Sequence, residues 1–133
     1  MDVVSKEAAR AGARALAVGR IALGLAALVI PSLPARAWLG GEAGRSKPVK
    51  VLARALGGRD LALGLGTILA LRHDAPVRGW VEAGGLADAG DLVATLAGWR
   101  SLPAPARLGV AALTAGGVAA ARLLSGSVDK VQP

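Results

Sequence analysis

The stretch that decides the fold is 51–71, with the sequence VLARALGGRDLALGLGTILAL. It is almost wholly apolar, and as a helix it is long enough to cross a bilayer. Arg59 and Asp60 nevertheless lie side by side near its middle. An ionised side chain at membrane depth is costly and normally faces protein or water, where it is paired. We therefore expect the rest of the chain to pack around this pair.

The composition of the 133-residue chain favours a single membrane domain. Hydrophobic residues make up 53% of it, and none of them is Phe or Tyr. Gly and Ala suit membrane helices because small residues let backbones approach closely. A soluble core of this size would normally use aromatic side chains as large fillers. A soluble helical bundle is the alternative interpretation.

Several kinds of chemistry are excluded or disfavoured by the residues present. The chain has no cysteine, and its one histidine, His73, cannot build a multi-histidine metal site. No serine stands beside a histidine, so the sequence shows no serine nucleophile with a histidine as its general base. The net charge of +7 is spread among apolar segments without aromatic stacking platforms, which favours lipid headgroups over nucleic acid. We predict no catalytic residue, no cofactor, no metal and no nucleic-acid partner.

Proline, glycine and charged residues divide the chain into four apolar helices. We expect these over residues 13–30, 51–71, 80–99 and 107–124, which together make an all-α, four-helix transmembrane bundle. Segment 31–48 is rich in Pro and Gly and is interpreted as a surface loop, part of which lies flat in the membrane interface.

The three tryptophans are interpreted as interfacial anchors. Trp80 and Trp99 are 19 residues apart, a span of about 28 Å at about 1.5 Å per helical residue. This span is close to the hydrocarbon thickness of about 30 Å, and tryptophans at both ends fit the aromatic belts of a membrane protein. Trp38 is the third anchor, in the interfacial segment 33–39.

The residues near the two chain ends predict a helix cap, a polar tail and the orientation of the protein in the membrane. We expect Ser5 to cap the first helix and residues 125–133 to form a frayed polar tail. Residues 6–37 also have the order of a signal peptide, but the long basic region and the likeness of this helix to 51–71 favour a retained helix. Seven positive residues on the side of the termini, against six on the other, favour cytoplasmic termini of a multi-pass cell-membrane protein.

An internal repeat relates the first two helices. ARALAVGRIALGL (13–25) and ARALGGRDLALGL (53–65) are identical at eight of thirteen positions. Each has a stripe of small residues around one charge, and these charges are opposite, Arg20 in one helix and Asp60 in the other. In an antiparallel hairpin both lie about 15 Å from the same surface. The repeat therefore predicts an Arg20–Asp60 pair. The close-packing positions of the two stripes are Gly24, Gly57 and Gly64.

The helix expected over 80–99 carries a similar stripe, with two carboxylates on it. The members of this stripe are Gly84, Asp88, Asp91, Thr95 and Gly98. Arg59 matches these carboxylates in depth, and we expect it to pair with Asp88 or Asp91. The resulting charge cluster consists of Arg20, Arg59, Asp60, Asp88 and Asp91. Two arginines cannot neutralise three aspartates, so Asp88 or Asp91 is expected to hold a proton near neutral pH.

Three stretches together resemble a known type of protein. GRIALGL (19–25) before Pro31, RALGGRDLALGLG (54–66) and GGLADAGDL (84–92) are similar to small four-helix membrane proteins of actinobacteria, a family defined only as a domain of unknown function. The first helix also resembles the DoxX-like membrane proteins. The resemblance implies a four-helix membrane protein and carries over no activity.

Three functions are compatible with these features. The favoured one is a scaffold or accessory subunit of a membrane complex, which contacts the bilayer and either a second copy or a membrane-protein partner. The second is a proton-coupled carrier or conductor that uses the charge cluster. The third, suggested by the DoxX-like resemblance, is a subunit of a membrane enzyme acting on quinone or lipid.

Overall fold

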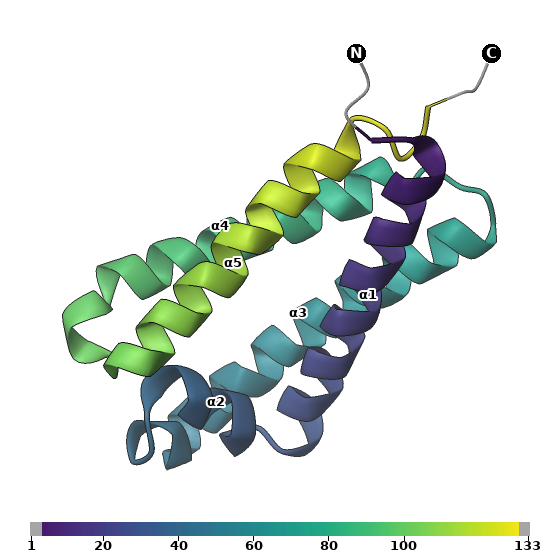
Figure 1. Ribbon diagram of the computed structural model, residues 1–133. Helices are drawn as coiled ribbons and strands as arrows, with labels where there is room; N and C mark the ends of the chain where they lie inside the picture. Colours follow the sequence, from purple (N-terminus) through teal and green to yellow (C-terminus); the bar gives the residue numbers. More distant parts are fainter. Residues whose placement is uncertain (1–3, 131–133) are drawn as a thin grey trace.

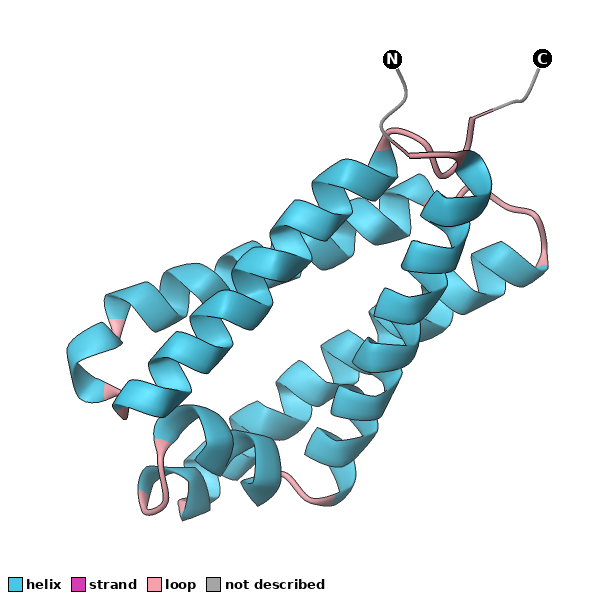
Figure 2. Cartoon of the chain, in the orientation of Figure 1, coloured by secondary structure: helices cyan, strands magenta, loops and turns pink. Residues whose placement is uncertain are grey.

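The computed structural model describes residues 4–130, and this part of the chain is helical without any strand (Figures 1 and 2). The all-α prediction is therefore confirmed. The α-helices are α1 (Lys6–Val29), α2 (Ser32–Leu39), α3 (Lys47–Arg72), α4 (Arg78–Ala97) and α5 (Ala104–Ser125), and the 3-10 turns are η1 (Ala43–Arg45) and η2 (Trp99–Ser101).

Helix α1 begins earlier than the apolar pattern alone indicates. Ser5 caps it as expected, because its Oγ accepts a hydrogen bond of 3.2 Å from the backbone N–H of Ala8. The first turns of α1 are therefore helical, and the small-residue stripe of the helix extends back to Ala9, which is completely buried. The helix ends at Val29, just before Pro31, whose ring cannot continue it.

The loop expected over 31–48 is largely helical instead, which corrects the sequence interpretation. Helix α2 accommodates Pro34 because the residue lies in the first turn, where a backbone N–H has no helical partner in any case. Gly40, with φ of 92°, ends the helix in a conformation that favours glycine. The short helix thus packs across the ends of the longer ones rather than forming an open loop (Figure 1).

The four long helices form two antiparallel pairs, α1 with α3 and α4 with α5 (Figure 1). At the α1–α3 crossing, a Cβ added at Gly24 would lie 2.7 Å from the carbonyl oxygen of Gly57. A Cβ added at Gly64 would lie 2.7 Å from the carbonyl oxygen of Ala17. Positions 24 and 64 are equivalent in the repeat, as are 17 and 57. The repeated segments therefore meet as an inverted pair, with small residues on both sides of its centre.

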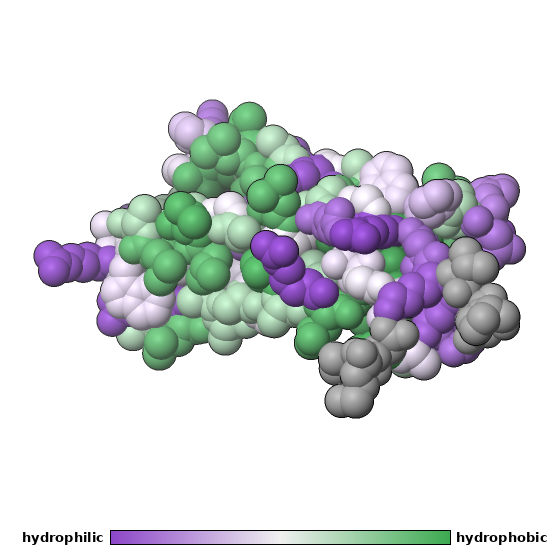
Figure 3. All heavy atoms as spheres, turned by 90° about the horizontal axis from the view of Figure 1, so that it is seen from above, coloured by the Kyte–Doolittle hydropathy of each residue, from purple (hydrophilic) through white to green (hydrophobic). Residues whose placement is uncertain are grey.

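The bundle has small residues inside and large aliphatic residues outside. The largest fully buried side chains are those of Val77, Val128 and Thr95, and most of the other buried apolar residues are alanines. In contrast, Leu86 is 75% exposed and Val93 is 66% exposed. Green and pale-green side chains cover much of the face drawn in Figure 3, while purple ones lie beside the grey chain ends, across the middle of the face and at the opposite end.

Two helices, α1 and α5, are long and apolar enough to cross a membrane, by length and composition. The same test does not select α3 or α4, which carry four of the five residues of the charge cluster. Helices of this kind also occur in the cores of soluble proteins and, near an N-terminus, as signal sequences. By itself this finding gives weak support for a membrane location.

The segment after α5 is anchored, which corrects the expected frayed tail as far as residue 130. Val128 is completely buried. The Asp129 carboxylate accepts hydrogen bonds of 2.9 and 2.8 Å from the backbone N–H groups of Val77 and Arg78 at the start of α4. Asp129 thus caps a helix that has no capping side chain of its own. Residues 131–133 of the expected tail lie outside the described residues.

We predict that Asp129→Ala lowers the free energy of unfolding by about 1 kcal/mol, the usual effect of removing a helix cap. Amide hydrogen exchange at Val77 and Arg78 should accelerate at the same time. Glu42→Ala is the control, because Glu42 is an exposed acidic residue outside both α4 and the segment that packs against it. Equal unfolding temperatures for the two variants would contradict the capping role.

Candidate functional site

The charge cluster lies near the middle of the long helices and joins three of them. The structure brings all five predicted residues together. Their side chains are 15–30% exposed. One residue comes from α1, two from α3 and two from α4, so the cluster links the α1–α3 pair to the α4–α5 pair.

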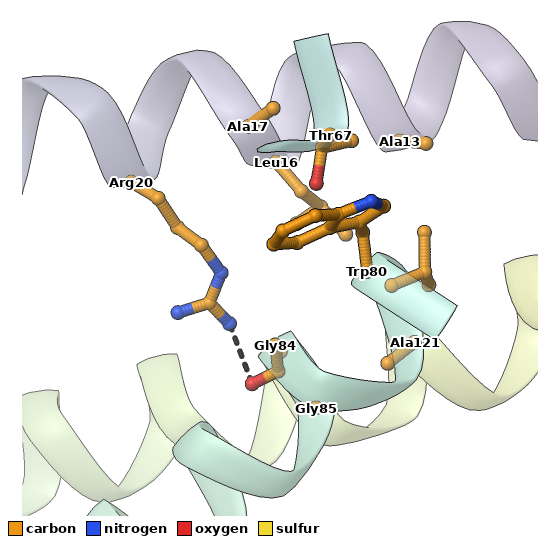
Figure 4. A pocket seen from close by; sticks show the side chains of 11 residues that line it. Ala13, Leu16, Ala17, Arg20, Thr67, Trp80, Gly84, Gly85 and Ala121 are labelled. Atoms are coloured by element: carbon orange, nitrogen blue, oxygen red, sulfur yellow. Dashed lines mark hydrogen bonds between the residues drawn. The ribbon is translucent and has the colours of Figure 1, made fainter. Parts of the chain in front are cut away.

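Arg20 is the centre of the cluster. Its Nη1 donates to Asp60 Oδ1 at 3.0 Å, and its Nη2 donates to Asp88 Oδ2 at 2.6 Å. Nη2 also donates to the carbonyl oxygen of Gly84 at 2.7 Å, the bond drawn in Figure 4. A Cβ on Gly84 would lie 3.0 Å from Arg20 Nε. A glycine at this position therefore makes room for the guanidinium against α4.

Arg59 makes the second set of ion pairs. It binds Asp91 with both ends of its guanidinium, Nη1 to Oδ1 at 3.0 Å and Nη2 to Oδ2 at 2.7 Å. This two-bond geometry is the strong arrangement for an arginine and a carboxylate. Nη2 also lies 3.3 Å from Asp60 Oδ1. Asp60 therefore accepts from both arginines.

These contacts agree with part of the predicted pairing. Arg20 binds Asp60, and Arg59 binds Asp91, as the matched depths predict. The additional Arg20–Asp88 pair was not foreseen. The sequence analysis placed Asp88 and Asp91 together on one stripe. A step of three residues is less than a full helical turn, however, so the two side chains point in different directions around the helix axis. In the tertiary structure Asp88 therefore reaches α1, whereas Asp91 reaches α3.

The counter-charge is distributed unevenly over the three carboxylates. Asp60 accepts from two guanidinium groups, and Asp91 accepts two bonds from one of them. Asp88 accepts a single bond, from an Nη2 that it shares with Gly84. The surplus negative charge of the cluster is therefore least compensated at Asp88.

The glycines expected at helix contacts divide into two groups. Gly24, Gly57 and Gly64 lie at the α1–α3 crossing, and Gly84 lies under Arg20. Gly98 instead ends α4, and an added Cβ there would make only ordinary contacts, which corrects its expected packing role. The reason is that α4 ends at Ala97, so position 98 no longer faces a neighbouring helix.

Further glycine contacts emerge only in the folded chain. An added Cβ would collide with the Asp88 carboxylate at Gly117 and with Ala121 at Gly85. These two contacts bring α4 and α5 close together. Gly85 and Gly117 each belong to a pair of adjacent glycines, a pattern that favours close helix contacts, but the pattern does not specify the neighbouring helix.

The tryptophans make more protein contacts than interfacial anchors would need. Trp38 Nε1 donates to Thr95 Oγ1 at 3.1 Å, because α2 folds back across the end of α4. The Arg107 guanidinium lies 5.1 Å from the centre of the Trp99 ring, a cation–π contact. Trp80 is 40% exposed, as a residue at an interface would be.

Trp80 separates two hollows that the sequence analysis did not detect. On its inner side is a cavity of about 10 Å³, lined by Arg20, Thr67 and mostly small residues (Figure 4). On its outer side is an open, mainly apolar groove of about 470 Å³, with His73 among its lining residues. Arg20, Thr67 and Gly84 line the cavity and lie on the small-residue stripes of α1, α3 and α4, and these stripes were the sequence signal for it.

No family model, no curated protein and no solved structure significantly matches the chain. Among residues 4–130, no group of three or more acidic or histidine side chains is placed to hold a metal ion. The chemistry available at the cluster is therefore that of ion pairs and proton binding, and the function is argued from this geometry.

Proposed function

We propose that this protein is a small integral membrane protein that crosses the cell membrane four times, through α1, α3, α4 and α5. The single observation that carries the proposal is the inverted distribution of polarity, with ion pairs and small residues inside and large aliphatic side chains outside. Water drives large aliphatic side chains inward, whereas a bilayer favours them on the outside. The resemblance to four-helix membrane proteins agrees with this proposal.

The extent of the exposed apolar surface supports it. Sixteen large hydrophobic residues are exposed on the four long helices and on α2, and Ile30, between α1 and α2, is a further one. Soluble monomers rarely expose contiguous apolar patches larger than a few hundred Å². Covering such a surface requires lipid or other protein along most of the length of the bundle.

The placement of the charges also fits a membrane. Four of the charged residues in α3 and α4 lie in the cluster and pair with one another or with α1, as intramembrane charges normally do. Arg14 is exposed on α1, two turns from its start. In this arrangement its long side chain extends along the helix to the headgroups.

We propose a scaffold or accessory-subunit role rather than catalysis. The cluster fixes the two helix pairs to each other, which is a structural task. Gly19, Gly58, Gly90 and Gly116 lie inside helices with nothing near an added Cβ. Such open small-residue faces permit close approach by a helix of a second copy or of a membrane-protein partner.

A substitution at Leu86 tests the membrane location. Leu86 is 75% exposed in the middle of α4. If this face contacts lipid, Leu86→Asp should prevent stable insertion, because a carboxylate at the centre of a membrane helix costs about 3 kcal/mol. Cells expressing the wild type should retain the protein in membranes washed with alkaline carbonate, and the variant should be depleted there. If the variant folds normally and the wild type is extracted without detergent, the bundle is soluble.

Single cysteines test the topology, since the chain has none of its own. Ser5 and Asp74 lie at the end of the bundle that holds the termini, and Ser46 and Ser101 lie at the opposite end; all four are exposed. Labelling intact cells with a membrane-impermeant thiol reagent should modify cysteines at 46 and 101 but not those at 5 and 74. Equal labelling of all four positions would contradict four crossings.

A second candidate function is proton-coupled transport, favoured by the undercompensated carboxylate of Asp88. Co-purification in mild detergent distinguishes the two functions. A stable complex with an identified membrane protein supports the accessory role. Proton-coupled flux by the isolated protein in liposomes supports the carrier role.

A further inference from the structure

We propose that Asp88 is a proton-binding site inside the bundle, and that its proton exchanges with outside water by a route that the Trp80 indole closes. The proposal rests on the hydrogen bonds of the charge cluster and on the two hollows beside Trp80. The proton site depends on packing inside the bundle, whereas the membrane proposal depends on the outer surface of the bundle, so failure of one is distinguishable from failure of the other.

The charges around Asp88 leave one negative charge without a cation. The charged groups that act on it are Arg20 from α1, Asp60 from α3 and Asp91 from α4 itself, and Arg59 completes the cluster through its ion pairs with Asp60 and Asp91. Helix α5 presents Gly117 there and no charged side chain. Two guanidinium charges are thus set against three carboxylates, in a region where the side chains are mostly buried. An uncompensated charge is expensive to bury, and binding a proton removes it.

The hydrogen bonds identify Asp88 as the carboxyl that takes this proton. Its Oδ2 accepts from Arg20, while its Oδ1 has no hydrogen bond to the described residues. Protonation at Oδ1 gives a neutral acid that still accepts from Arg20 through Oδ2. The same change at Asp91 would disrupt a two-bond ion pair with Arg59. In this step a proton from water adds to the carboxylate oxygen, and its release returns it to water.

A metal ion fits this position poorly. Hard cations such as Mg²⁺ and Ca²⁺ take six or more oxygen ligands, and the cavity beside Arg20, about 10 Å³, has room for about one water molecule. Arg20 Nη2 already lies 2.6 Å from the Asp88 carboxylate and would repel a second cation. The proton is the one cation that needs no coordination shell.

The inner cavity supplies the first step of a route outward. A buried water molecule needs two or more polar partners. The Thr67 hydroxyl and the Arg20 guanidinium line the cavity, and the Arg20 hydrogen bonds in the described chain use Nη1 and Nη2, which leaves Nε–H able to donate. A water held here lies next to the arginine that binds Asp88 (Figure 4).

The Trp80 indole closes this cavity toward the outer groove. Trp80 lines both hollows. Its six-membered ring packs on the bare backbone of Gly66, where an added Cβ would collide with three ring atoms. Displacement of the ring would join the cavity to the groove, whose outer part includes the exposed His73. An imidazole there can pass protons between the groove and bulk water.

Infrared spectroscopy of the purified full chain at pH 7 tests the proton itself. Exposed carboxyl groups are ionised at this pH, so a carboxylic-acid C=O band reports a buried protonated acid. We expect this band in the wild type and its loss in Asp88→Asn. Because Asn resembles a protonated Asp, Asp88→Asn should melt at the wild-type temperature. Asp91→Asn, the matched control, should melt lower because it breaks the Arg59 ion pair.

The proton-binding site is overturned by either of two results. One is a wild-type spectrum at pH 7 without a carboxylic-acid band. The other is an Asp88→Asn variant that melts as low as Asp91→Asn, which would mean that Asp88 is an ionised partner of Arg20. Repetition of the spectrum with Na⁺ replaced by a bulky organic cation should leave the band unchanged. A band that strengthens on Na⁺ removal would show that Na⁺ competes for the carboxylate and would overturn the proton-only site.

Transfer into D₂O tests the route. The carboxylic-acid band should shift slowly in the wild type and in Trp80→Phe, because both keep a ring over the cavity. The shift should be faster in Trp80→Ala. Trp99→Ala is the control for loss of a tryptophan, since Trp99 lines neither hollow. Equal rates in Trp80→Ala and Trp99→Ala, with helical circular dichroism retained, would overturn the route through Trp80.

Discussion

We expect Arg20→Ala to destabilise the protein more than Gly24→Ala at the same α1–α3 interface. It removes the cation that binds both Asp60 and Asp88, and with Asp88 protonated it leaves one negative charge in the bundle without a cation. Breaking a buried ion pair by removing one partner costs on the order of 3–5 kcal/mol. This is a large fraction of the roughly 5–15 kcal/mol that stabilises a typical domain. The measurement is thermal unfolding in detergent, followed by circular dichroism.

The double variant Arg20→Ala with Asp60→Ala should recover part of this loss. With Asp88 protonated, the remaining Arg59 and Asp91 are a balanced pair, so no charge is stranded. Arg14→Ala is the matched control, because Arg14 is exposed on the same helix, and we expect it to change stability by less than about 0.5 kcal/mol. If the single and double variants melt together, the Arg20–Asp60 pairing does not contribute to stability.

Gly24→Ala should also destabilise the protein strongly, although alanine is the better helix former. A Cβ at position 24 would lie 2.7 Å from both Gly57 O and Leu61 N. These are backbone atoms and cannot rotate away, so α1 and α3 would have to separate. Overpacking of this kind typically costs about 1–3 kcal/mol. The separation would also weaken the Arg20–Asp60 contact at the centre of the same interface.

Gly19→Ala is the matched control for this prediction. Gly19 lies in the same helix, and an added Cβ there meets nothing within 4 Å. Replacing an unconstrained helical glycine by alanine stabilises by roughly 0.5–1 kcal/mol. The two substitutions should therefore shift the unfolding temperature in opposite directions. Shifts of the same sign would mean that the α1–α3 crossing is looser than the structure indicates.

The sequence by itself determined the helical class, the small-residue stripes and the pair at the centre of the repeat. These features depend on the helical period and on the number of residues that separate two positions in the sequence. Residues 13–25 and 53–65 have the same periodic pattern, so antiparallel packing places Arg20 opposite Asp60 without further information. The glycines at the α1–α3 crossing followed from the same pattern, whereas Gly85 and Gly117 did not. The packing role expected for Gly98 was wrong because α4 ends just before this residue. Beyond a helix end the helical period no longer predicts which neighbour a residue faces.

Only the tertiary structure decided how α4 joins the α1–α3 pair. Asp88 and Asp91 are equivalent on a stripe, and which of them meets Arg20 depends on the angle and distance between the helix pairs. The helical segment 32–39, the cap by Asp129 and the position of Trp80 between two hollows depend on contacts between distant residues. The period of a helix specifies which side chains share a face, but only packing specifies which neighbour that face meets.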